Sequence, residues 1–223
     1  MPYSEPQDAR RSLFGSRQFS KQIAAATELD AEVVANACGA LVATGLIPCA
    51  AEENTEALAT EGALVLMAIG GRQAQPDAIV RVLARLSNMT HQVVVGTGTP
   101  GIQGGRERAP ADLFAQGLSD VLKQTWQILR EPPGGRIGAV NVSMLWGDER
   151  GGVLYGVIDH VADHRKHVYS SATLPVPHGI ADEWDFVQLH TVGGAIFSPQ
   201  SILRFATSLE DSVAGTAAEL DAQ

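Results

Sequence analysis

Positive charge is missing from a long stretch of this 223-residue chain, because residues 22–71 contain no lysine or arginine. The same stretch carries seven acidic residues, and the whole chain has a net charge of −9. Proteins that coat nucleic acid depend on cations that neutralise phosphates, so this balance argues against that class. Any phosphate contact is therefore expected from the N-terminal arm and the first helix, where Arg10, Arg11, Arg17 and Lys21 lie.

Cysteine and long apolar runs are also scarce. Cys38 and Cys49 are the two cysteines, which fits free thiols in a reducing compartment better than a disulfide framework. No apolar run approaches the roughly 20 residues of a membrane span, and residues 1–17 have no apolar core of a signal peptide. With 45% hydrophobic and 18% charged residues, the composition indicates a folded, cytoplasmic protein without a membrane contact.

Two short helical patterns meet at a tight turn within residues 18–48. Residues 28–30 separate them, and Asp30 is a good N-cap for the second helix because its carboxylate can accept backbone N–H bonds. Gly45 suits the left-handed residue that ends a helix, shortly before Pro48. This spacing predicts a helix-turn-helix, which is typical of DNA binding or of plain helical packing.

The second of these helices, residues 31–44, is poor in side chains that read bases. It contains no Lys, Arg, Gln or Ser, and Asn36 and Thr44 are its polar groups beyond Glu32. Glu28 also stands in the turn where this motif usually has glycine. Asn36 is the candidate for a base contact, while the four cations named above are candidates for phosphate contacts.

The rest of the chain divides into helical and then strand-like patterns. Apolar periodicity predicts helices at 60–70 and 76–87 and a long helix from Pro110 to Glu131, and alternation around the polar turn 147–152 predicts a β-hairpin. Further strands are expected at 167–174 and 184–194, before a helix that starts at Ser198 or Pro199. The pattern predicts an α+β fold in five parts: a flexible basic arm (1–17), a helical module (18–95), a Gly-rich linker (96–109), an α+β module (110–209) and an acidic tail (210–223).

The linker prediction has a measurable consequence. Residues 96–109 are rich in Gly and Pro, and each flanking part has enough apolar residues for its own core. Cutting there is expected to leave two folded pieces. The start of this run also matches a strand followed by G-x-G-x-x-G, but Pro100 and Gly101 prevent the helix that a dinucleotide site needs, so a connecting loop is favoured.

Several apolar and Gly-Leu-Ile-Pro positions carry a family resemblance. The runs ELDAEVVANACGALVATGLIP, ATEGALVLMAIGG, PDAIVRVLARL and DLFAQGLSDVLKQ, followed by the strand AVNVSMLW, resemble predicted helix-turn-helix regulators of alphaproteobacterial prophages and gene transfer agent loci. The resemblance covers roughly residues 18–146. It implies a small helical module before a helix and a small sheet, with a role in transcription on DNA or through RNA polymerase.

The densest group of potential metal ligands is the histidine run that contains His160, His164 and His167. Neutral imidazoles are the ligands of catalytic zinc, but Arg165 and Lys166 add positive charge that disfavours a dication. A solvated polar loop between two strands is the favoured interpretation, with a metal site or proton chemistry as alternatives.

The sequence therefore favours a cytoplasmic transcription regulator with no cofactor. Its expected partners are DNA or RNA polymerase, and an unpaired sheet edge allows a homo-oligomer. No serine-nucleophile signature is present, so a conventional enzyme is not expected. The alternatives are a metal-dependent enzyme that uses the three histidines, and a structural or adaptor protein.

Overall fold

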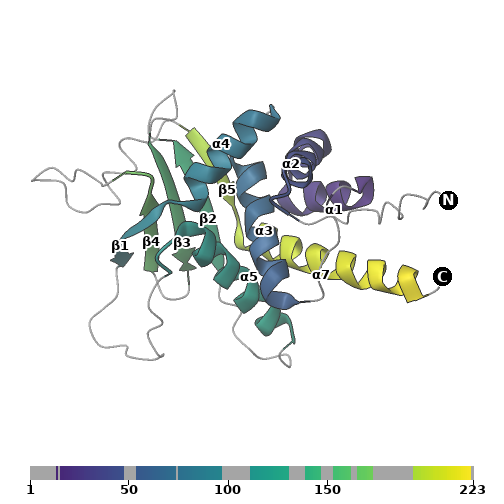
Figure 1. Ribbon diagram of the computed structural model, residues 1–223. Coiled ribbons are helices and arrows are strands. Elements are labelled where there is room, and N and C mark those ends of the chain that lie inside the picture. The colour runs from purple at the N-terminus through teal and green to yellow at the C-terminus, as the bar shows by residue number, and fades with distance from the viewer. Residues whose placement is uncertain are drawn as a thin grey trace, which may run out of the picture.

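The structure is a computed structural model in which a layer of helices covers one face of an antiparallel sheet (Figure 1). It describes residue 14 and residues 16–47, 54–73, 75–96, 111–130, 139–146, 153–161, 165–172 and 193–221. Helices come before the sheet and one helix follows it, so the predicted α+β class is confirmed.

Four helices form the N-terminal part of this layer: α1 (Arg17–Thr27), α2 (Ala31–Ala43), α3 (Thr55–Gly70) and α4 (Pro76–Ser87). Asp30 caps α2, and Pro76 occupies the first turn of α4, both as the sequence predicts. α3 begins five residues before the expected residue 60, because the side chain of Asn54 accepts a hydrogen bond from the Glu56 amide and caps the helix earlier.

Five strands form the sheet in the order β1-β4-β3-β2-β5, with every described neighbour antiparallel. The strands are β1 (Thr90–Gly96), β2 (Val140–Trp146), β3 (Leu154–His160), β4 (Arg165–Ser170) and β5 (Gly193–Phe197). β2 and β3 pair as the predicted hairpin.

Two strand predictions need correction. β4 begins at Arg165 rather than at residue 167, because Arg165 and Lys166 still pair with the end of β3. Of the strand expected at 184–194, the structure describes residues 193–194, which begin β5 (Gly193–Phe197); β5 therefore continues beyond the expected end, and residues 184–192 lie outside the described residues. Small residues at its start hid β5 from a search for alternating large apolar residues.

Two further helices complete the layer: α5 (Phe114–Arg130) and α7 (Pro199–Asp221). The Ser198 hydroxyl accepts a hydrogen bond from the Ser201 amide at 3.1 Å, which confirms the predicted start of α7. α7 continues to Asp221, past the residue at which the sequence places the acidic tail. Within the described residues, no helix is both long and apolar enough to cross a membrane.

Glycines let α5 lie close against the sheet and let α3 lie close against α5 and α7. A Cβ atom on Gly117 of α5 would lie 2.8 Å from both Ile158 Cδ1 and the Tyr169 hydroxyl, and one on Gly156 of β3 would lie 2.6 Å from the Phe114 ring. Gly62 of α3 is covered in the same way by side chains of α5 and α7. The apolar core therefore forms where α3 and α5 meet the sheet.

This core extends across the predicted linker. β1 belongs by sequence to the helical module, yet it pairs with β4 of the α+β module. The Trp126 indole N–H of α5 donates to the Ala206 carbonyl oxygen of α7 at 2.8 Å, and the same buried cluster reaches Phe19 on α1. The five-part division stays a prediction, but these contacts favour joint rather than independent folding of its two modules.

Two glycine substitutions should change stability in opposite directions. Gly39 lies exposed within α2 with open space around its Cβ position, so Gly39→Ala should stabilise the fold by about 0.5–1 kcal/mol. Gly117→Ala should destabilise the fold by roughly 1–3 kcal/mol, because its methyl group overlaps β3 and β4. Urea unfolding measures both, and a stabilising Gly117→Ala would contradict the close approach of α5.

Candidate functional site

A tight turn at residues 28–30 joins α1 to α2. Glu28 adopts φ 58° and ψ 31°, the left-handed conformation that favours glycine. The Leu29 amide donates to the Ala24 carbonyl at 3.1 Å and ends α1, and Asp30 Oδ1 accepts from the Glu32 amide at 2.7 Å and starts α2. The predicted turn is therefore present, with glutamate at the glycine position.

The predicted nucleic-acid residues fall on different elements. Arg17 and Lys21 are exposed one turn apart on α1, and Asn36 is exposed on α2. Arg10 and Arg11 lie outside the described residues. The structure thus places two of the four cations on one helix and the candidate base contact on the next.

The outward face of α2 is almost uncharged. Val33 is 36% exposed on this helix, and Leu46, just beyond it, is 43% exposed. Glu32 supplies the charge of this face, and α2 carries no Lys or Arg. We call the exposed residues of the helix the α2 face: Ala31, Glu32, Val33, Ala35, Asn36, Gly39 and Ala43. Small and apolar side chains of this kind suit packing against a protein better than approach to phosphates.

Three histidines meet on the face of the sheet that α5 covers. The ring centroids of His160 on β3 and His167 on β4 lie 5.5 Å apart, and those of His167 and His91 on β1 lie 5.6 Å apart. His91 also lies 5.2 Å from the ring of Tyr169, which packs against Phe114 of α5 at 5.4 Å. We call the three imidazoles the histidine cluster.

The histidine cluster corrects the expectation of a solvated loop. His160 is the last residue of β3 and His167 lies within β4, where alternation with buried neighbours turns both rings toward α5. His164 lies outside the described residues. Sequence reasoning missed His91, because its approach to His167 depends on pairing of β1 with β4, more than 70 residues apart in the chain.

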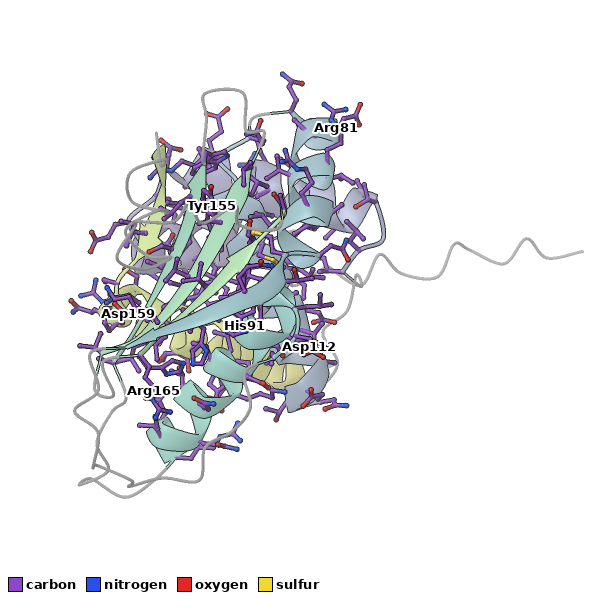
Figure 2. The ribbon with its side chains drawn as sticks, turned by 90° about the vertical axis from the view of Figure 1, so that its left-hand side faces the viewer. Arg81, His91, Asp112, Tyr155, Asp159 and Arg165 are labelled. Carbon is purple, nitrogen blue, oxygen red and sulfur yellow. The ribbon has the colours of Figure 1, made fainter. Side chains whose placement is uncertain are left out.

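Burial disfavours protonation of two members of the histidine cluster, because it lowers the pKa of His91 and of His167. Desolvation, assisted by His160, His91 and Arg165, lowers the pKa of His167 to about 4. Desolvation also lowers the pKa of His91, although the carboxylate of Asp112 acts in the opposite direction. Figure 2 shows His91 and Asp112 where β1 passes α5, with Arg165 at the far end of the strands.

Two ring nitrogens of the histidine cluster are left without hydrogen bonds. His91 Nε2 and His167 Nδ1 are buried and have no hydrogen-bond partner in the part of the chain that the structure describes. Buried polar atoms of this kind call for a structural or functional explanation. The described residues contain no group of three His, Cys, Asp or Glu side chains able to hold a metal ion.

The interpretation of the glycine-rich run after β1 as a connecting loop rather than a nucleotide site stays a prediction. β1 ends at Gly96, α5 starts at Phe114, and residues 97–110 lie outside the described residues.

In comparisons with known proteins, no family model, curated protein or solved structure matches this chain. The α2 face and the histidine cluster are the two features of the described residues that bear on function.

Proposed function

We propose that this protein is a phage-type transcription regulator that acts through RNA polymerase, with the α2 face as its contact surface. The observation that carries the proposal is the exposed and nearly uncharged α2 face, which follows the tight turn between α1 and α2. The resemblance to prophage and gene transfer agent regulators supports the same role.

Charge around the turn favours a protein partner over base recognition. Glu28, Asp30 and Glu32 surround the start of α2, which is the end that enters the major groove in DNA-binding proteins of this motif. Three carboxylates there would repel phosphates. Arg17 and Lys21 lie on the preceding helix and can add phosphate contacts, but such contacts carry no sequence information.

Self-association is compatible with this proposal. Within the described residues, β1 and β5 form the two edges of the sheet, and an unpaired edge can accept a strand from a second copy. The proposal does not require an enzymatic activity or a cofactor. A metal-dependent enzyme built on His160, His164 and His167 is not favoured by any observation in the described residues.

A charge placed on the α2 face should weaken binding to the polymerase. Val33 is the third residue of α2, a position where glutamate is favourable for the helix, so Val33→Glu should leave the fold intact. We expect Val33→Glu to lower affinity for purified alphaproteobacterial RNA polymerase by about tenfold or more, because the carboxylate becomes desolvated at the interface. Biolayer interferometry measures this affinity.

Leu129→Glu is the matched control, since Leu129 is 40% exposed on α5, away from the α2 face. It should bind the polymerase as the unchanged protein does. Equal binding by Val33→Glu and the unchanged protein would contradict the proposed contact surface, and no binding by either would contradict the polymerase as partner.

DNA binding should be weak and without sequence preference. Replacing Arg17 and Lys21 with alanine should flatten the dependence of log affinity on log salt by roughly 0.9 for each phosphate that the protein no longer neutralises. Arg81→Ala is the control, because Arg81 is an exposed cation on a different helix, α4 (Figure 2). A fluorescence titration that finds strong binding to one sequence, abolished by Asn36→Ala, would overturn the polymerase route in favour of base recognition.

A further inference from the structure

The edge strand β1 depends on a small number of partners. In the described residues it pairs with β4 on one side, and its ladder has an irregularity between His91 and Val93. At its start, the His91 amide donates to the Asp112 carbonyl at 2.9 Å, and the Phe114 amide donates to the Met89 carbonyl at 3.0 Å. β1 therefore lies between β4 and the segment that leads into α5.

The histidine cluster lies at the boundary between β1 and β4, which we call the seam. His91 comes from β1, His167 from β4, and His160 extends the row onto β3. The two unpartnered ring nitrogens, His91 Nε2 and His167 Nδ1, belong to the two sides of this seam. His91 and His167 are half-buried, so a proton on either ring introduces charge into the partly desolvated contact between β1 and β4.

The charged groups around the cluster do not neutralise more than one imidazolium. Arg165 of β4 points to the same face and adds positive charge, while Asp112 acts on His91 from the segment before α5. Asp120 of α5 is engaged at 2.9 Å by Lys123, which also binds Glu56, and the Tyr169 phenol stays protonated because burial, Asp120 and Asp112 raise its pKa to about 12. On the opposite face, Asp159 and Lys166 pair with each other at 3.6 Å.

We propose that His91, His160 and His167 form a pH-sensitive clasp that holds β1 on the sheet at neutral pH and releases it in mild acid. The direction of the pH effect follows from the thermodynamic linkage between protonation of the histidines and release of β1. A histidine that is harder to protonate in the closed state stabilises that state above its ordinary pKa of about 6.5, and this stabilisation is lost as the pH falls through the lowered pKa, about 4 for His167.

Hydrogen exchange on the intact protein tests the release. Protection factors, corrected for the intrinsic exchange rate at each pH, should fall for residues 90–96 by on the order of tenfold between pH 7 and pH 5. Protection in β2 and β3, away from the seam, should stay nearly constant. An equal loss in every strand would mean global unfolding and would overturn the proposal.

Substitutions distinguish an effect of the histidines on β1 from a general destabilisation of the protein by acid. His91→Gln and His167→Gln each remove one titrating ring, so each should clearly reduce the pH response of β1. Lys166→Gln is the matched control, because Lys166 neighbours His167 on β4 but faces the opposite side. A full response in both histidine variants would overturn the clasp.

Two measurements on the unchanged protein remain decisive if the variants fail to fold. The ring resonances of His91 and His167 should titrate below pH 6.5 by nuclear magnetic resonance, and titration at or above that value overturns the proposal. Zinc added at pH 7 should leave the protection of β1 unchanged. A tenfold gain in protection with zinc would instead identify a metal centre and overturn the clasp.

Discussion

The close approach of α3 and α5 to one face of the sheet is the constraint on which the rest of the structure depends. It exists because Gly70, Gly117 and Gly156 carry no side chain where α3 and α5 meet the sheet. Phe114 can then lie on β3 and meet Tyr169, whose ring in turn contacts His91. Packing at this density transmits small changes in position, so a single methyl group at Gly117 would move α5 and everything that rests on it.

The two surfaces of interest sit at opposite ends of this arrangement but remain physically connected. The α2 face lies on the side of the helical layer away from the sheet, and the histidine cluster lies between the sheet and α5 (Figure 1). Asn88 and Met89 alone join α4 to β1, and α4 packs against α2. A movement of β1 therefore acts directly on α4, the helix that packs against α2. In this way, release of β1 in acid changes the support of the proposed contact surface, the α2 face.

Short-range sequence patterns predicted much of the fold. They did not predict the contacts between segments that are far apart in the chain. Asp30, Gly45 and Pro76 mark helix ends through caps and backbone conformation, and the structure confirms all three. The place of β1 in the sheet and the approach of His91 to His167 depend on strand pairing far along the chain. The sequence therefore predicted the elements and the turn of the candidate site, but not the histidine cluster.

One continuous core joins the N-terminal helices to the sheet, and both proposed surfaces depend on it. Urea unfolding of the intact protein, followed on one sample by circular dichroism for the helices and by tryptophan fluorescence, tests this most directly, because Trp126 lies buried between α5 and α7 and Trp146 lies in β2. We predict a single transition with the same midpoint by both signals. Two separate transitions would show that the helical part and the sheet unfold independently, and would contradict the continuous core.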